Sequence, residues 1–169
     1  MARAPGRNPF HAARRPPCMH RTTVLRGDAD DPAVANGVVT HHPDHDRVRL
    51  SGMTWPEGTP AEQARHLLAY VETLLEREVG GEMADVTYLR FFLREGNADE
   101  ATREAIEAVE REFFEAPALP GTTMVGVADL LVEGAAFELE VEAMVPTRER
   151  TVETRRLSPE GGDGADGGR

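Results

Sequence analysis

The chain has 169 residues, a formal net charge of -11 and one cysteine. This length predicts a single domain with spare chain at both ends. The acidic balance argues against a nucleic-acid partner, because binding to phosphate needs a basic face. The lone Cys18 excludes an internal disulfide and fits the reducing cytoplasm.

All the basic side chains are arginine, since the sequence contains no lysine. An acid-rich surface without lysine is typical of halophilic proteins, in which solvated carboxylates keep the molecules soluble and apart. A high-GC codon bias would also replace lysine by arginine. Both explanations stay open.

The first 18 residues differ from the rest in charge, since they contain four arginines and no acid: Arg3, Arg7, Arg14 and Arg15. They are either a basic arm for nucleic acid or membrane, or an extension ahead of a true start at Met19, which is the favoured interpretation. No apolar run is long enough for a signal peptide or a membrane span, so no membrane partner is expected. The predicted division is a non-native or disordered extension over 1–18, a domain over 19–146 and a disordered tail over 147–169.

The first regular elements are short strands. Thr23–Leu25 is a strand candidate, and Val38–Thr40 with Arg47–Leu50 is typical of a hairpin. The loop between them, His41–Asp46, holds three histidines and two aspartates. These could bind a metal, but no spacing matches a known site, so we interpret the segment as a solvated turn and expect no metal or other cofactor.

The first helix has clear signals at both ends. Thr59, Pro60 and Glu62 predict an N-cap, a first helical residue and a capping box, and Gly80 predicts the end. The predicted core stripe is Ala64, Leu67, Leu68, Val71, Leu74 and Leu75. A strand over Val86–Leu93 follows, and then a second helix that starts near Asn97 and Glu100, carries Ile106, Val109 and Phe113, and ends at Pro117 and Pro120.

The last part of the domain is predicted to be an antiparallel hairpin. Thr122–Val132 and Phe137–Val145 are extended runs joined by the turn Glu133-Gly134-Ala135. Alternation in the second run predicts one buried face and one face of glutamates. We expect Val125 and Val127 in the core, and Thr122 and Glu140 together on the opposite face.

The order of elements indicates an α+β domain with one sheet, covered on one face by two amphipathic helices. The other face of the sheet combines glutamates with apolar side chains. It is therefore too polar for a core and too apolar for a surface that is fully exposed to solvent. A homo-oligomer that packs these faces together would resolve the conflict.

Several short motifs, in this order, resemble the YjgF/RidA family: Leu50-Ser51-Gly52, Asp85-Val86-Thr87, Phe113-Phe114, the run from Pro120 to Ala128, and Leu139-Glu140-Val141-Glu142-Ala143. The resemblance implies a chorismate-mutase-like fold with a single mixed sheet, a homotrimer with an inner β-barrel, and ligand clefts between subunits. It also implies hydrolysis of reactive enamines or imines such as 2-aminoacrylate, without a cofactor. Glu140 matches the glutamate near the attacking water, and Ser51, Gly52, Thr122 and Met124 fall at ligand-binding positions.

The chain departs from the family at the arginine that grips the substrate carboxylate, where it has Thr122. The family's tyrosine near the first strands also has no counterpart at Val38 or Val39. Two functions therefore compete: a hydrolase with Glu140 as its catalytic residue, divergent from 2-aminoacrylate deaminases, and a non-catalytic trimer that binds a metabolite or a protein in the same clefts. Family members have also been named ribonucleases, which the acidic charge of this chain argues against.

Overall fold

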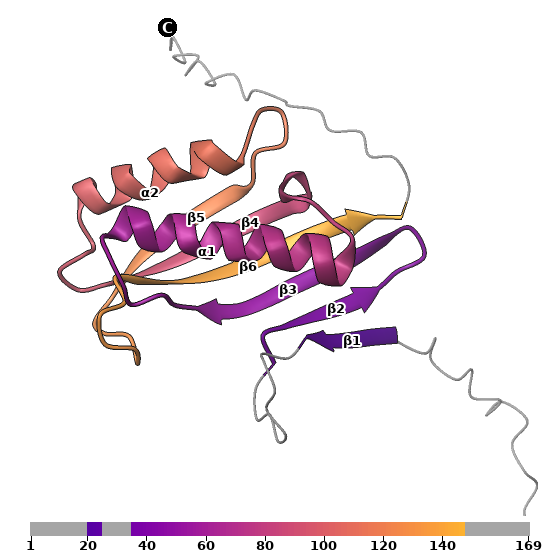
Figure 1. Cartoon of the computed structure of the whole chain (residues 1–169), viewed down its shortest axis with the longest axis horizontal. Helices are drawn as coiled ribbons and strands as arrows, with labels where there is room; N and C mark the ends of the chain where they lie inside the picture. Colours follow the sequence, from indigo (N-terminus) through magenta and orange to yellow (C-terminus); the bar gives the residue numbers. More distant parts are fainter. Residues whose placement is uncertain (1–19, 25–34, 148–169) are drawn as a thin grey trace, which may run out of the picture.

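The computed structural model describes residues 20–24 and 35–147, which form one six-stranded mixed sheet and two helices (Figure 1). The predicted N-terminal extension, and the predicted C-terminal tail after Thr147, lie outside the described residues. The strands are β1 His20–Val24, β2 Gly37–His41, β3 His45–Met53, β4 Val86–Arg94, β5 Gly121–Val127 and β6 Phe137–Pro146, and the helices are α1 Pro60–Leu74 and α2 Glu100–Phe113. None of the described helices is long and apolar enough to cross a membrane.

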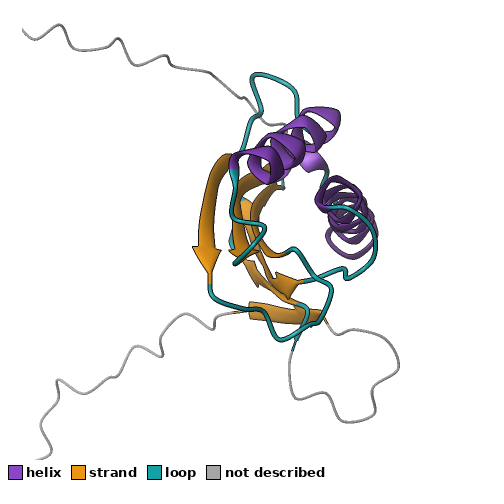
Figure 2. Ribbon diagram, turned by 90° about the vertical axis from the view of Figure 1, so that its left-hand side faces the viewer, coloured by secondary structure: helices purple, strands orange, loops and turns teal. Residues whose placement is uncertain are grey.

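The sheet has the strand order β1-β2-β3-β6-β4-β5. Strand β6 is antiparallel to both β3 and β4, and β4 is parallel to β5. The chain thus contains two crossover units, β3-α1-β4 and β4-α2-β5, that step across the sheet in the same direction. Because such crossovers are right-handed, both helices lie on one face and leave the other face open (Figure 2). The predicted α+β class and the one-sided helix layer are confirmed.

The predicted signals of α1 are confirmed at both ends. Thr59 is the N-cap and forms the capping box with Glu62. After Leu74 the helix continues as a π-helical turn over Leu75–Val79, and it ends at Gly80, whose φ of 73° is left-handed. Helix α2 starts two residues later than predicted, because Asp99 accepts a hydrogen bond from the backbone N–H of Thr102 at 2.8 Å and is the cap.

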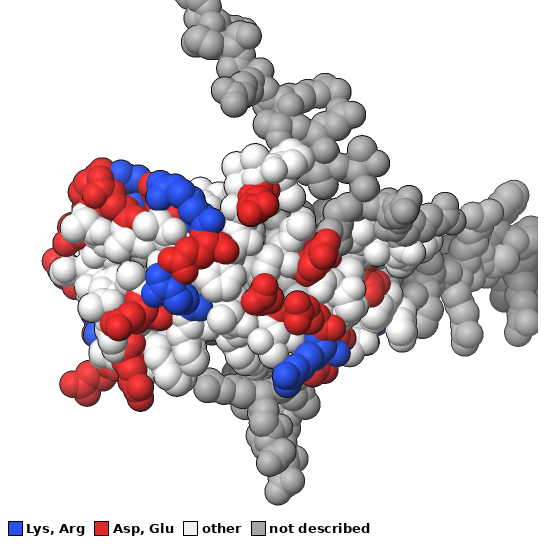
Figure 3. Space-filling model, turned by 45° about the horizontal axis from the view of Figure 1, so that its top comes forward, with Lys and Arg blue, Asp and Glu red and all other residues white. Residues whose placement is uncertain are grey.

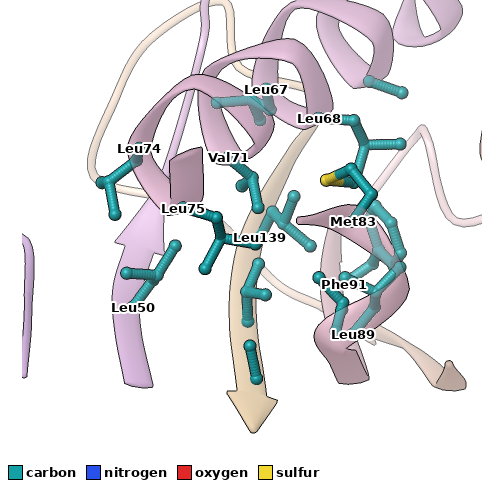
Figure 4. Close-up of a cluster of buried hydrophobic side chains, with 14 of the residues drawn as sticks. Leu50, Leu67, Leu68, Val71, Leu74, Leu75, Met83, Leu89, Phe91 and Leu139 are labelled. Carbon is teal, nitrogen blue, oxygen red and sulfur yellow. The ribbon is translucent and has the colours of Figure 1, made fainter. Parts of the chain in front are cut away.

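The core lies between the helices and the sheet. The predicted stripe of α1 is buried and packs onto β3, β4 and β6 (Figure 4), and Phe91 meets Phe137 edge to face with ring centroids 5.4 Å apart. The buried apolar members of α2 are Ile106 and Val109. Burial of these side chains is the main stabilising term of the domain.

The predicted hairpin between the last two strands is wrong. Strand β5 pairs with β4 in parallel, so β4 separates it from β6. The turn at Gly134 does exist, with a φ of 83°. It lies in the connection from β5 to β6, and these two strands are not neighbours in the sheet. Arg94 holds this connection by donating to the carbonyls of Leu130 at 3.2 Å and Val132 at 2.6 Å. The short strands at the N-terminal side are confirmed as β1 and as the hairpin β2–β3.

Candidate functional site

The open face of the sheet carries a row of charged side chains from three adjacent strands. Since side chains alternate along a strand, the residues between the buried ones of β3, β4 and β6 point away from the helices. They include Arg47 and Arg49 on β3, Tyr88 and Arg90 on β4, and Glu138, Glu140 and Glu142 on β6. The predicted row of carboxylates is therefore present, and it faces arginines of both neighbouring strands.

Glu140 lies at the centre of this row. It is directly opposite Arg90 in the register, and the two side chains form an ion pair in which Arg90 Nη1 donates to Glu140 Oε2. The ring of Tyr88 lies 5.3 Å from the Arg90 guanidinium carbon, and the Tyr88 hydroxyl is hydrogen-bonded to Thr123 Oγ1. A carboxylate, a guanidinium and a phenol thus meet on one surface, which is a set able to bind a small polar molecule.

A second ion-pair group borders the first. Glu142 accepts hydrogen bonds from Arg47 and from Arg49, both at 3.0 Å. The hydrogen bond from Arg47, followed by that from Arg49, lowers the pKa of Glu142 below its usual value. This carboxylate is therefore committed to structural pairing, whereas Glu140 pairs with Arg90 alone within the part of the chain that the structure describes.

The two groups border a depression of about 230 Å³ on the open face. Its lining consists of Arg49, Leu50, Tyr88, Arg90, Glu140, Val141 and Glu142. The depression is large enough for a small metabolite, and its walls are mostly polar or charged. We take the residues that line it as the candidate site and call it the open-face site.

Ser51 and Gly52 lie where β3 and β6 change register, between the pairs at Leu50 and Met53. A Cβ at position 52 would come within 2.0 Å of Glu138 Oε1, so glycine lets that carboxylate lie flat against β3. The Ser51 hydroxyl donates to the carbonyl of Ala35 at 2.7 Å. The structure therefore places Gly52 beside the glutamate row and gives Ser51 a local backbone partner.

Thr122 and Met124 lie on the opposite face from Glu140, which corrects the predicted facing of β5. They are in register with the buried Leu89 and Phe91, and Met124 packs against the core. The prediction failed because β5 takes its register from β4 instead of from β6. Val125, expected in the core, is instead 40% exposed on the open face.

The Thr122 hydroxyl donates to Glu110 of α2 at 3.0 Å. The two residues border a groove that is also lined by Phe114, Leu119 and Pro120. Burial raises the pKa of Glu110, and the hydrogen bond from Thr122 opposes this effect. Within one subunit, Glu140 and Gly52 therefore lie on one surface, and Thr122 and Met124 lie on the other.

The histidine-rich turn between β2 and β3 is a set of local pairs. His41 lies 2.9 Å from Asp46, His45 lies 2.9 Å from Asp44, and His42 stacks on His45. Among the described residues, no group of three or more His, Cys, Asp or Glu side chains is arranged to hold a metal ion.

Sequence reasoning missed Tyr88 and Arg90. Both lie inside the predicted strand Val86–Leu93, where they alternate with the buried Leu89 and Phe91. An arginine at an outward position of a central strand was the available signal. Its partner could not be inferred, because that required knowing that β6 lies beside β4.

Comparison with known proteins assigns the family. The family model described as "Endoribonuclease L-PSP" matches residues 30–145. A search of curated proteins gave no match. Among solved structures, a member of the YjgF/YER057c/UK114 family from Mycobacterium tuberculosis is 28% identical, with a TM-score of 0.61, and the match covers 75% of this chain and all of that one.

A second solved structure, a YjgF protein family member from Neisseria meningitidis, shares the fold. It is 23% identical with a TM-score of 0.62, and the match covers 78% of this chain and 98% of that one. The motif order, the mixed sheet with its one-sided helix layer and the family model agree. The chain belongs to the endoribonuclease L-PSP family, which is the YjgF/RidA family.

Proposed function

We propose that this protein binds and hydrolyses a small reactive imine or enamine metabolite, in clefts completed by neighbouring subunits of a homotrimer and without a cofactor. The observation that carries the proposal is the position of Glu140, whose carboxylate lines a depression on the open face of the sheet. Gly52 lies on the same side of the sheet, next to the glutamate row.

The reaction that fits this site is addition of water to a carbon–nitrogen double bond. Glu140 accepts a proton from the water as its oxygen bonds to the imine carbon. The nitrogen then takes up protons and leaves with its bonding pair as ammonia, while the carbonyl forms. A single carboxylate within hydrogen-bond reach of the water is enough for this general-base step.

Two exposed apolar side chains support the trimer. Val125 is 40% exposed and Met144 is 45% exposed, both on the face that no helix covers. Methionine and arginine are enriched in contacts between subunits, and this face carries Met144, Arg47 and Arg49. We expect light scattering at micromolar concentration and high salt to give the mass of three chains, and a monomer would count against the shared cleft.

A non-catalytic trimer that binds a metabolite or a protein is the second candidate. It is favoured by the ion pair between Glu140 and Arg90, because this contact already occupies one carboxylate oxygen of Glu140. Thr122, at the position of the family's arginine, is also engaged with Glu110. Both observations permit binding without turnover.

We propose that this chain does not share the endoribonuclease activity after which the family is described. Its net charge is -11, and acidic side chains are interspersed with arginines on the side that carries α2 (Figure 3). A surface of this kind repels a phosphate backbone. We expect no cleavage of RNA, which incubation with a labelled single strand would check.

The test of the hydrolase is ammonia release from freshly generated 2-aminoacrylate. Glu140→Gln keeps the shape of the side chain and removes the base, so we expect kcat/KM to fall by about two to four orders of magnitude. Glu112→Gln is the matched control, because Glu112 pairs with Arg65 between the two helices, away from the site. Equal rates for wild type and Glu140→Gln would refute the catalytic role, and a wild type that binds keto acids without releasing ammonia would favour the second candidate.

A further inference from the structure

A hydroxyl, an imidazole and a carboxylate form a hydrogen-bonded chain near the β1 edge of the sheet. Thr22 Oγ1 lies 2.9 Å from His41 Nε2, and His41 Nδ1 lies 2.9 Å from Asp46 Oδ1. The three residues come from three adjacent strands, since Thr22 is on β1, His41 ends β2 and Asp46 is on β3. They are connected like a nucleophile, its general base and the group that orients the base.

The two hydrogen bonds of His41 determine which ring nitrogen carries the proton. An ionised carboxylate can only accept hydrogen bonds, so Nδ1 carries a proton and donates it to Asp46. In the neutral ring Nε2 then has a free lone pair, which accepts from the Thr22 hydroxyl. His41 therefore has the tautomer of a general base, with its basic nitrogen directed at a hydroxyl.

The imidazole is enclosed by its neighbours, whereas the hydroxyl is accessible. The side chains of His41 and Asp46 are 29% and 22% exposed, and the His20 ring packs on His41 with ring centroids 4.5 Å apart. Thr22 is exposed. The base is thus held in position, and the hydroxyl next to it can meet a substrate.

Thr22 lines a hollow of about 330 Å³ between β1 and the end of α1. Val24, Tyr70 and Leu74 give the hollow an apolar and aromatic lining, and Arg77 of the π-helical turn also lines it. The hollow is large enough for a small organic molecule with an apolar group. The guanidinium of Arg77 can donate hydrogen bonds to an oxygen that becomes negative.

This group is separate from the open-face site. His41 and Asp46 are each two residues from a buried valine, Val39 and Val48 respectively, and Thr22 is in register with Val39. Because side chains alternate along a strand, all three point to the face that the helices cover. A reaction here would use none of the residues that line the open-face site.

We propose that Thr22, His41 and Asp46 form a second hydrolytic site, which cleaves small carboxylic esters through an acyl-threonine intermediate. Thr22 Oγ1 bonds to the ester carbonyl carbon, His41 Nε2 takes the hydroxyl proton, and the carbonyl π pair moves to the oxygen, where Arg77 stabilises it. The carbonyl then reforms, and the alcohol oxygen leaves with its bonding pair and takes the proton from Nε2. Water attacks the acyl carbon in the same way, so that the carboxylic acid is released and Oγ1 regains a proton through His41. Asp46 is a positioning residue, which holds the tautomer of His41.

Hydrolysis of p-nitrophenyl acetate by the full chain tests the nucleophile and the base. We expect Thr22→Val and His41→Gln to lower kcat/KM by roughly hundredfold or more, and Thr22→Ser to keep the activity, because serine retains the hydroxyl. A fluorophosphonate probe, which phosphonylates an activated hydroxyl and releases fluoride, should label the peptide that contains Thr22. His41→Gln should prevent this labelling.

Two further variants test the supporting groups. Asp46→Asn should lower kcat much more than it raises KM, because an amide can hold the wrong tautomer of the ring. Arg77→Met should lower kcat by about tenfold or more, since a donor to the oxyanion is lost. His45→Gln is the matched control: His45 lies in the same turn, contacts Asp44 and stacks on His42, and should react like wild type.

The melting temperature of each variant shows whether it is folded. A folded Thr22→Val that hydrolyses the ester at the wild-type rate would refute the nucleophile, and so would a probe that labels wild type elsewhere and leaves Thr22 unlabelled. Turnover by wild type no faster than by free imidazole at equal concentration would refute the site. Since labelling is measured on wild type, the proposal can fail even where a variant does not fold.

Discussion

Asp85, at the entry to β4, should make this protein less stable as the pH rises. Its side chain is 3% exposed, and Oδ2 accepts a hydrogen bond from the backbone N–H of Glu82 at 2.9 Å. Burial raises the pKa of Asp85 from 3.8 to about 6. The folded state therefore holds the proton more tightly than the unfolded state, and stability declines wherever the folded state binds more protons.

The size of the effect follows from the two pKa values. Each pKa unit corresponds to about 1.4 kcal/mol, so the penalty rises to about 3 kcal/mol above pH 6 and is absent well below the unfolded pKa. Asp85→Asn, which cannot ionise, removes this dependence. Between about pH 4.5 and about pH 7.5 its free energy of unfolding should gain about 2 kcal/mol relative to wild type.

Urea unfolding of wild type and Asp85→Asn at both pH values measures this difference without assuming the absolute stability of either protein. Asp44→Asn is the control, since the hydrogen bond from His45 lowers the pKa of this exposed carboxylate and gives the opposite sign. A constant difference between wild type and Asp85→Asn across the pH range would refute the reasoning, because it would mean that Asp85 is ionised in the folded state at both values.

Two further changes test the core and the facing of β5. Phe137→Ala removes a side chain that is 0% exposed, and should lower the free energy of unfolding by about 3 to 5 kcal/mol in a urea titration; a loss below about 1 kcal/mol would contradict the packing against Phe91. Thr122→Arg should pair with Glu110 on the helix side and raise the melting temperature without raising ammonia release. A gain in ammonia release that Glu140→Ala then abolishes would show that a neighbouring subunit brings position 122 to the open-face site.

The parts of the fold predicted correctly from the sequence are those with local causes. Thr59 and Glu62 cap α1 through contacts within one turn, and Gly80 ends it because its backbone is left-handed. Alternation along β6 likewise predicted the buried and exposed sides of that strand. Each of these features depends on neighbours only a few residues apart.

The errors concern pairing between distant segments. The turn at Gly134 suggested that β5 and β6 are neighbours, but the parallel partner of β5 is β4, reached through α2. A shift of one residue in register reverses the facing of a strand, and this placed Thr122 with Glu140 in the prediction. Arg90 was not predicted as a site residue for the same reason. Only the strand order, in which β4 lies beside β6, places it next to Glu140.

The buried Gln63 of α1 has a consequence for the order in which the chain folds. Its amide donates to the carbonyls of Gly58 and Gly134, and accepts from the backbone N–H of Ala136. The two contacts with the β5–β6 connection join residues 71 and 73 positions apart. Bringing residues so far apart in the sequence together costs conformational entropy before the hydrogen bonds between them can form. We therefore expect this connection to become ordered late in folding, and φ-values near 0 for substitutions within it would show this.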